Sequence, residues 1–331
     1  MSIEQICAGF ERKNVLITGG TGMIGREIAE LLANHGANVR VVSLDRINLN
    51  ENIDHVYGDL TDFNFCLEQT KDMDFVFHVA GIKGSVKVTT ERPASFFVPL
   101  LMFNTNVLEA SRRNGVQKLV YTSSIGAYSS AEVFQESLDE ETLPPMDMFP
   151  GWAKRMAEHQ IKAYQIQYGL MDYSIVRPCN VYGPGDNFDP ENAMVIPTLM
   201  ARIANGENPV KVWGDGSSIR DFAFSRDVAI GTIQAIASGT GGRYINLGSG
   251  VGVSIRQLVE TLAEFIDFKY EFDASKPSGF PRRVMDISLA RGMIGYNPST
   301  TLKSGLEETW HWYLKNKTEF EQKQNYFNEK I

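Results

Sequence analysis

The amino-acid sequence predicts an α/β fold, in which a doubly wound parallel sheet carries a smaller, interleaved C-terminal lobe. Two observations support this prediction. Short apolar runs alternate with longer amphipathic segments, and the first of these runs leads directly into a turn with three glycines. Such alternation is typical of parallel strands connected by crossover helices. With 331 residues, the chain is long enough for one large unit or two closely packed lobes.

The first unit reads as strand, glycine turn, helix and second strand. Residues 14–18 (NVLIT) form the strand, GGTGMIG is the turn, residues 26–36 place apolar side chains on one helical face, and NVRVVSL follows. Glycines at this spacing make a tight turn, admit a pyrophosphate to the backbone, and let the helix pack on the strand. The helix N-terminus offers free N–H groups to the phosphate. The sequence therefore predicts a Rossmann dinucleotide site with pyrophosphate contacts at Gly19, Gly22, Met23, Ile24 and Gly25.

The choice between NAD and NADP depends on the residues after the second strand. Asp45 is the expected acceptor for the adenosine ribose hydroxyls, although it stands later than usual and Ser43 is an alternative occupant of that position. Arg46 follows, and a guanidinium there would suit the 2′-phosphate of NADP. NAD is favoured; the alternative to cofactor binding is a solvated loop position for Asp45. The remaining expected cofactor contacts are Arg46, Asp59, Leu60 and Ala80.

The later elements continue the alternation. Helices are expected at 94–114 and 151–168, a fifth strand leads into Ser123-Ser124, and a sixth ends at RPCN. The segments DVAIGTIQAIASG and RYINLGSG read as a helix and a strand that return to the first lobe. The predicted dinucleotide-binding domain is 1–177 together with 225–250, and the second lobe is 178–224 together with 251–331.

Composition and charge exclude several classes of function. A net charge of −8 argues against nucleic acid as a partner, which would need clustered Lys and Arg. The three cysteines are far apart and form no CxxC pair, so no metal site and no disulfide is expected. No apolar run is long enough for a membrane span or a signal peptide. We therefore expect no membrane partner and a cytoplasmic location.

Motifs spread over nearly the whole chain carry a family resemblance. They are TGGTGMIG (18–25), YGDL (57–60), HVAG (78–81), YTSS…Y (121–128), GWAKRMAE (151–158), RPCNVYGPGDNF (177–188), VWGDGSSIRDF (212–222) and PRRVMDISLA (281–290). The chain resembles the extended short-chain dehydrogenases/reductases (SDR) that act on nucleotide sugars, the NAD-dependent epimerase/dehydratase family. Its motifs are most similar to those of the GDP-fucose synthase, UDP-galactose 4-epimerase and GDP-sugar dehydrogenase branches.

The resemblance implies a catalytic set with one departure. In such enzymes a Ser or Thr, here Ser124, hydrogen-bonds the reacting sugar hydroxyl. A helix lysine, here Lys154, binds the nicotinamide ribose and lowers the pKa of a catalytic tyrosine. The tyrosine position holds Pro150, which suits a helix start but transfers no proton. Three alternatives are open: Ser124, a water or a substrate group relays the proton; Tyr128 or Tyr182 substitutes; or the site is inactive.

The resemblance also implies substrate contacts, most of them in the second lobe. Arginines are expected at the sugar diphosphate because guanidinium groups match phosphate oxygens. For these arginines, the alternative is ion pairing with Asp221, Asp227 and Asp286. For Trp213, the alternative to a place near the base is a place in the core. The expected substrate contacts are Ser124, Asn180, Asn192, Val195, Trp213, Arg220, Arg282 and Arg283.

The predicted function is NAD-dependent oxidation of a ring hydroxyl, at C4, of a GDP-linked hexose or heptose to a 4-keto sugar. The alternative within the class is an epimerase or a 4-keto reductase, and the alternative outside it is a non-catalytic NAD-binding sensor. Family relatives pair the helices at 94–114 and 151–168 in a four-helix interface, so a homodimer is expected and a tetramer is left open. The apolar stripe of these helices is Phe96, Phe97, Leu100, Leu101, Met156, Ile161 and Tyr164.

Overall fold

The large lobe is built on a sheet of seven strands, all paired in parallel, in the order β11-β7-β5-β4-β1-β2-β3. The computed structural model describes residues 2–82, 84, 86–189 and 192–317. The strands are β1 (Asn14–Thr18), β2 (Asn38–Ser43), β3 (Asp54–Tyr57), β4 (Phe75–His78), β5 (Lys118–Thr122), β7 (Tyr173–Pro178) and β11 (Tyr244–Leu247). The predicted doubly wound α/β fold is therefore confirmed.

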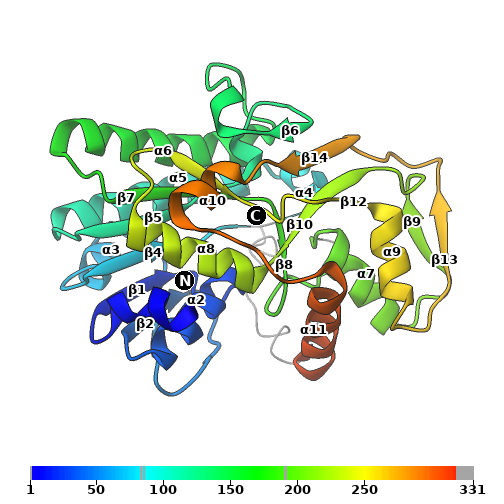
Figure 1. The fold of residues 1–331 in the computed structure, drawn as a ribbon, viewed down its shortest axis with the longest axis horizontal. Coiled ribbons are helices and arrows are strands. Elements are labelled where there is room, and N and C mark those ends of the chain that lie inside the picture. Colours follow the sequence, from blue (N-terminus) through cyan, green and yellow to red (C-terminus); the bar gives the residue numbers. More distant parts are fainter. Residues whose placement is uncertain (1, 83, 85, 190–191, 318–331) are drawn as a thin grey trace.

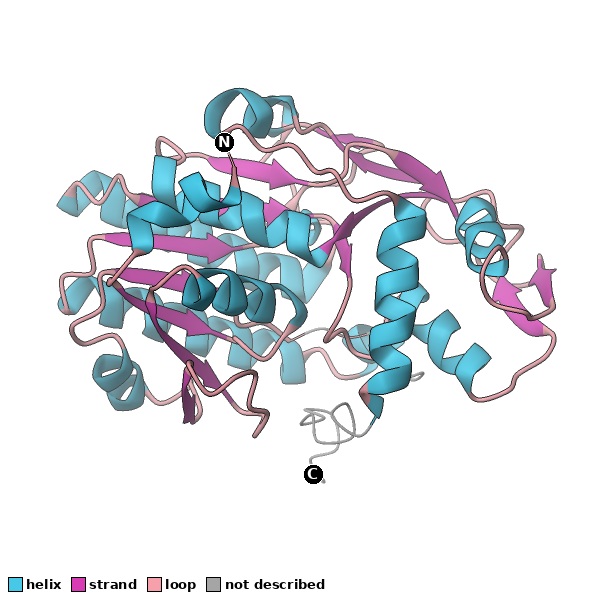
Figure 2. Ribbon diagram, turned by 60° about the horizontal axis from the view of Figure 1, so that its bottom comes forward, coloured by secondary structure: helices cyan, strands magenta, loops and turns pink. Residues whose placement is uncertain are grey.

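Helices cover both faces of this sheet (Figures 1 and 2). One face carries α1 (Ile3–Cys7), α2 (Met23–Asn34), α8 (Ser225–Ser238) and α10 (Ser288–Ile294). The other carries α3 (Phe63–Gln69), α5 (Ala94–Arg113) and α6 (Met148–Tyr168), and α4 (Val86–Glu91) precedes α5. Because both faces are covered, the central strands are almost continuously apolar: β1 (NVLIT) buries its last four residues.

The strand order reverses next to β1, where β2 lies on one side and β4 on the other. In open α/β sheets, ligands bind in the crevice at the carboxyl ends of the strands at such a switch point. The fold therefore directs a ligand to the loops that follow β1 and β4.

The small lobe contains a five-stranded sheet and a two-stranded sheet beside the large one (Figure 1). Its elements are β6 (Val133–Phe134), β8 (Asn180–Tyr182), α7 (Val195–Ala204), β9 (Val210–Trp213), β10 (Ile219–Phe224), β12 (Gly252–Ser254), α9 (Ile255–Ala263), β13 (Tyr270–Asp273), β14 (Arg282–Met285) and α11 (Leu302–Lys315). A separate apolar core lies between these sheets and helices. The short strand β6 comes from the loop between β5 and α6 and pairs with β14, so this loop reaches across to the small lobe.

The chain returns to the large lobe after β10. Helix α8 packs beside α2, and β11 pairs with β7 at the sheet edge. Helix α10 also packs there, because Ala290 and Ile294 are buried in the same core as α8. Residues 288–294 thus lie on the large sheet, although the sequence assigns them to the second lobe. The exact domain boundaries stay a prediction, and residues 318–331 lie outside the described part.

Among the described residues, no helix is long and apolar enough to cross a membrane. Within the same part of the chain, His, Cys, Asp and Glu form no group of three that could hold a metal ion.

Candidate active site

A cavity of about 750 Å³ lies at the switch point, at the carboxyl ends of β1 to β4. The loops after these strands supply most of its wall, and the start of α5 closes one side. Its wall includes six of the residues that the sequence predicts as cofactor contacts: Gly19, Gly22, Asp45, Asp59, Leu60 and Ala80. The structure therefore brings predicted cofactor contacts from the loops after all four strands to one cavity.

The glycine turn after β1 packs closely on the loop after β4 and leads into the N-terminus of α2. Gly19 has a φ of 68°, and a Cβ on it would lie 2.6 Å from the Cα of Ala80, so only glycine fits there. Gly22 is the N-cap of α2 and supplies no side-chain cap. Met23 and Ile24 are the first two helical residues, whose N–H groups have no partner within the helix. Such a cradle suits a pyrophosphate.

On the adenosine side, two carboxylates line the cavity. Asp45 accepts a hydrogen bond from Thr21 Oγ1 at 3.1 Å, and Asp59 accepts one from the backbone N–H of Thr61 at 2.8 Å. Arg46 does not line the cavity. Its guanidinium lies 5.9 Å from the ring centre of Tyr57. The residues present therefore fit a dinucleotide, with acceptors where ribose hydroxyls would lie.

Ser124 and Lys154 both lie at the carboxyl end of β5. Ser124 follows β5 and starts the 3₁₀ turn Ile125–Ala127; its Oγ accepts from the N–H of Gly126 at 3.0 Å. Lys154, on α6, donates from Nζ to the carbonyl of Thr122 at 2.7 Å. That Nζ lies 3.9 Å from where a Cβ on Gly81 would be, and Gly81 lines the cavity. The ammonium is therefore within reach of a ligand bound along the loop after β4.

Burial perturbs the groups at this end of the sheet. It lowers the pKa of Lys154 to about 8, while the Glu158 carboxylate acts in the opposite direction. The hydroxyls of Thr122 and Ser123 are buried and make no hydrogen bond with the described residues. Buried hydroxyls usually have partners, so this position suits a polar ligand.

A buried ion cluster fixes α6, and with it Lys154, against the sheet. Arg177, on β7, donates to both oxygens of Glu158 at 2.9 and 2.7 Å and to Asp139 at 2.6 Å. Its side chain is fully buried. Glu158 lies one helical turn beyond Lys154, so this fork sets the rotation of the helix.

Pro150 is the third residue of α6, in the first turn, where a missing N–H costs no helical hydrogen bond. Neither tyrosine considered as its substitute faces the site. Tyr128 is buried, and its hydroxyl donates to Asn246 Oδ1 at 2.9 Å. Tyr182 is buried in the core of the small lobe beside α11. Both tyrosines are therefore packed in the interior, with their hydroxyls hydrogen-bonded to other residues.

Two arginines of the small lobe lie side by side on neighbouring strands. Arg220 on β10 and Arg283 on β14 are direct partners in the strand pairing, so their side chains share a face. Burial lowers the pKa of Arg220 to about 10, with Arg283 adding to the effect, and burial also lowers the pKa of Arg283. The Nε of Arg283 is buried without a partner among the described residues. Two desolvated neighbouring cations suit a diphosphate.

Among the described residues, no ion pair joins these arginines to Asp221, Asp227 or Asp286, and the aspartate nearest to Arg283 is Asp147, at 3.9 Å. Arg220 donates to the carbonyls of Ile219 and Phe280. Arg282, next to Arg283 in the strand, points to the opposite face, where Nη1 lies 3.4 Å from where a Cβ on Gly252 would be. The structure thus separates the predicted arginine pair and leaves Arg283 as the member that faces Arg220.

The other predicted substrate residues take three different positions. Asn180 lies beside β10 and donates to the carbonyl of Asp221 at 3.0 Å. Asn192 is buried and donates to Asp189, and Val195 packs at the start of α7. Trp213 is 66% exposed, so a place in the core is ruled out for it. Substrate contact stays a prediction for all four, and the neighbouring residues 190–191 lie outside the described part.

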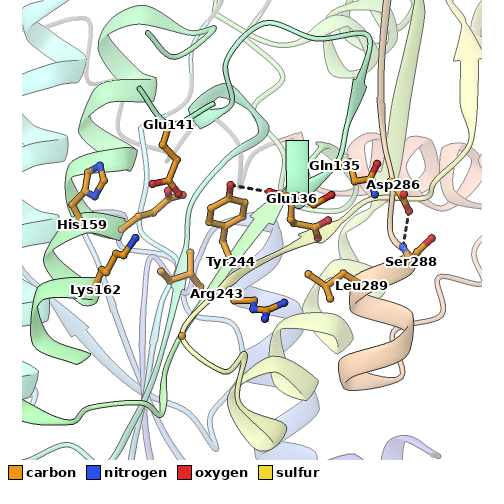
Figure 3. A pocket seen from close by; sticks show the side chains of 14 residues that line it. Gln135, Glu136, Glu141, His159, Lys162, Arg243, Tyr244, Asp286, Ser288 and Leu289 are labelled. Atoms are coloured by element: carbon orange, nitrogen blue, oxygen red, sulfur yellow. Dashed lines mark hydrogen bonds between the residues drawn. The ribbon is translucent and has the colours of Figure 1, made fainter. Parts of the chain in front are cut away.

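A second cavity, of about 640 Å³, lies where β11 and α10 meet the side of α6 (Figure 3). Ionisable side chains from several elements surround it, among them Glu136, Glu141, His159, Lys162 and Arg243. Its wall shares no residue with the first cavity and contains none of the predicted site residues.

Comparison with known proteins agrees with this geometry. The description "NAD dependent epimerase/dehydratase family" matches residues 15–248. The chain is 32% identical to GDP-L-fucose synthase 1 of Arabidopsis thaliana, over 91% of this chain and 93% of that protein. It is 32% identical to GDP-L-fucose synthase of Escherichia coli K12, over 94% and 99%.

Solved structures give the same result. An epimerase from Methanothermobacter thermautotrophicus superposes with a TM-score of 0.84 at 26% identity, covering 97% of each chain. UDP-glucose 4-epimerase from Thermotoga maritima, solved with UDP-glucose, gives 0.77 at 28% identity, covering 92% of this chain and 99% of the other.

The fold and the glycine cradle define a Rossmann-fold enzyme of the SDR type. The chain belongs to the NAD dependent epimerase/dehydratase family. Together, the family and these relatives support NAD(P)-dependent modification of a nucleotide sugar as its class of reaction.

Proposed function

We propose that the protein is an NAD-dependent dehydrogenase that oxidises the C4 hydroxyl of a GDP-linked hexose or heptose to a 4-keto sugar. One observation carries the proposal: the cofactor cradle, Ser124 and Lys154 converge at one end of the sheet, while the position of the acid tyrosine holds Pro150. Such a site retains the parts that position a substrate and has lost the usual proton donor.

The residues of the chain divide the work between them. When bound, the nicotinamide dinucleotide supplies a two-electron acceptor. Lys154 holds the nicotinamide ribose, and Ser124 orients the sugar hydroxyl through its Oγ. Arg220 and Arg283 bind the diphosphate with their guanidinium groups, which fixes the sugar between the small lobe and the 3₁₀ turn.

The loss of the tyrosine bears on which reaction we propose. A reductase must protonate an alkoxide, and an epimerase must both remove and return a proton, so each depends on a proton donor. Oxidation only requires an acceptor, which a carboxylate or water can provide. General acid–base catalysis contributes roughly 10²–10⁴-fold, so the enzyme is expected to be slow.

Two features support NAD and GDP as the nucleotides. Asp45 presents a carboxylate at the cavity wall, which suits a ribose hydroxyl and repels a 2′-phosphate, and Arg46 lies against Tyr57. The relatives at 32% identity over more than nine tenths of this chain are named GDP-L-fucose synthases.

Product analysis tests the proposal. The protein is incubated with NAD and a panel of GDP-, UDP- and dTDP-linked sugars, the product is reduced with borodeuteride, and mass spectrometry locates the deuterium. We expect deuterium at C4 of a GDP-linked sugar. Deuterium at another carbon, or turnover of UDP- or dTDP-sugars alone, would reject the proposed substrate.

The second candidate is a 4-keto reductase or epimerase, which the names of the GDP-L-fucose synthase relatives favour. It predicts the reverse flow of electrons: a GDP-linked 4-keto sugar would be consumed together with NADH or NADPH faster than any GDP-sugar is oxidised. A sensor without activity would bind the dinucleotide and consume neither.

A further inference from the structure

Oxidation of a hydroxyl requires a proton acceptor, and His78, whose pKa Lys154 influences, cannot serve. His78 is fully buried between Thr18 Oγ1, at 2.7 Å, and Asn104 Oδ1, at 3.0 Å. Burial lowers its pKa to about 3, with Lys154 adding to the effect. Because both of its ring nitrogens already have partners, His78 is a fixed part of the sheet.

Asp147 is placed differently, at the N-cap of α6. Positions 147, 150 and 154 are spaced i, i+3 and i+7, so they lie along one face of the helix. Asp147 therefore stands one turn before Pro150, the position of the missing tyrosine, on the face that carries Lys154. Side chains on a helix lean toward its N-terminus, which is the direction of Asp147.

The proline also explains why this carboxylate is available. An N-cap Asp usually accepts a hydrogen bond from the second or third N–H of its helix. The third residue of α6 is Pro150, which has no N–H, and the Asp147 side chain makes no capping hydrogen bond. The residue that removes the tyrosine thus also removes a donor that would have held the carboxylate.

The contacts of Asp147 lie between the two halves of the proposed substrate site. A Cβ on Gly126 would lie 2.9 Å from Asp147 Cγ and closer still to Oδ2, so glycine is required for the approach. The N–H of Gly126 is the group that donates to Ser124 Oγ. On the other side, Asp147 Oδ1 lies 3.9 Å from Nη1 of Arg283.

We propose that the Asp147 carboxylate is the proton acceptor that replaces the missing tyrosine. The inference rests on the proposed function. In the step, the hydroxyl O–H bond breaks and its proton goes to Asp147, directly or through one water. The C–H bond breaks with both electrons leaving to the nicotinamide dinucleotide, and the C=O bond forms. Asp147, whose side chain is 47% exposed, then releases the proton to solvent.

The surrounding charges agree with this role. Partial burial raises the pKa of Asp147, and Arg283 on β14 opposes the rise. From the 3₁₀ turn, the backbone of Gly126 faces it, and on its own helix Lys154 lies two turns away. A diphosphate bound to Arg283 would weaken that opposing effect, so substrate binding would make Asp147 a stronger base.

A double-mutant cycle tests the proposal. Single-turnover reduction of NAD by the GDP-linked sugar is measured from pH 6 to 9 for D147N in the wild-type and P150Y backgrounds. The control is E140Q, which removes an exposed carboxylate of the same loop. In the wild-type background, we expect D147N to lower the single-turnover rate roughly 10²-fold or more and to remove the low-pH ionisation from the rate profile. In the P150Y background, we expect D147N to lower the rate less than about threefold.

A second readout does not depend on turnover. Calorimetry in two buffers of different ionisation enthalpy measures the protons taken up when GDP-mannose binds without added dinucleotide. Wild type is expected to take up a larger fraction of a proton than D147N, because the carboxylate loses its ion pair with Arg283.

The outcomes separate the two claims. Suppose that wild type oxidises GDP-sugars but D147N keeps the wild-type rate and pH profile, or lowers the rate by the same factor in both backgrounds. Asp147 is then not the proton acceptor, and the proposed function still holds. If wild type oxidises no nucleotide sugar, the proposed function fails and the assignment of Asp147 fails with it. Equal proton uptake by wild type and D147N also overturns the assignment.

Discussion

Asp45 is the residue expected to decide which dinucleotide binds. Its carboxylate lines the cavity, and a hydrogen bond to a charged group contributes about 1.5–3 kcal/mol, or about 10- to 100-fold in affinity. We expect Asp45→Ala to weaken NADH binding by at least about tenfold and to leave NADPH binding unchanged or tighter. Fluorescence titration measures both, with the exposed Glu51→Ala of the same loop as control. Tighter binding of NADPH than NADH by wild type would contradict the choice of NAD.

Lys154 is expected to lower the stability of the ligand-free protein. Its folded pKa, about 8, lies below the ordinary value of 10.5, so between these values the unfolded chain binds more protons than the folded one. The free energy of unfolding should therefore rise with pH from about 8 to 10.5, by at most about 3 kcal/mol, the cost of the buried charge at pH 7.

Urea unfolding measures this dependence. Lys154→Met should raise the free energy of unfolding at pH 7 and remove the rise at higher pH, while weakening NADH binding about tenfold or more. Lys162→Met, at an exposed position of the same helix, should leave both unchanged. A K154M protein whose stability follows the same pH curve as wild type would show that the ammonium is not desolvated.

At the scale of elements, β14 places its two arginines on opposite faces. Arg283 shares the face of Arg220, whereas Arg282 lies near Gly252. We expect Arg283→Gln to raise the KM for the nucleotide sugar about tenfold or more, and Arg282→Gln to change it less than about twofold. If Arg282→Gln raised the KM more than Arg283→Gln, the diphosphate would have to bind on the face of the sheet that carries Arg282.

The elements also show what sequence patterns could and could not predict. The strand–turn–helix unit at residues 14–36 could be predicted because its glycine spacing and apolar periodicity are local. Strand β6 is two residues long and has no periodicity, so only its pairing with β14 reveals it. The approach of Asp147 to Gly126 and the separation of Arg282 from Arg283 depend on tertiary contacts between segments far apart in the chain.

Ser124 and Lys154 could be assigned from motifs, because Ser124 follows a predicted strand and Lys154 lies in the first turns of a predicted helix. The tyrosines could not be judged in the same way. Tyr128 stands in the family motif, yet its hydroxyl is bound to Asn246, which is distant in sequence. Asp147 could have been noticed from the sequence, since an aspartate three residues before a proline at a helix start is a cap without its donor.

At the scale of the whole molecule, α5 and α6 present an apolar face that supports the proposed homodimer. The exposed fractions are 49% for Val98, 45% for Met102, 42% for Phe149 and 42% for Met156. The predicted stripe is partly core, because Phe96, Leu100 and Ile161 are buried against the large sheet. The interface is therefore expected to use the outward residues of the two helices.

Light scattering after size-exclusion chromatography tests this surface. The double variant Met102→Glu with Met156→Glu should be monomeric, because it would bury charges in an apolar interface. Leu138→Glu, at a position that is 70% exposed outside these helices, should remain a dimer. A monomeric wild-type protein would contradict the proposed interface.

The central claim is that this site transfers hydride although Pro150 replaces the tyrosine. The most direct measurement mixes the purified protein, in excess, with NAD and a GDP-linked sugar and follows absorbance of NADH in a single turnover. We expect a slow rise to one equivalent of NADH per sugar, and a faster rise for P150Y by roughly 10-fold or more. If wild type binds both ligands and forms no NADH, while P150Y does, the wild-type site is inactive and the proposed dehydrogenase function is wrong.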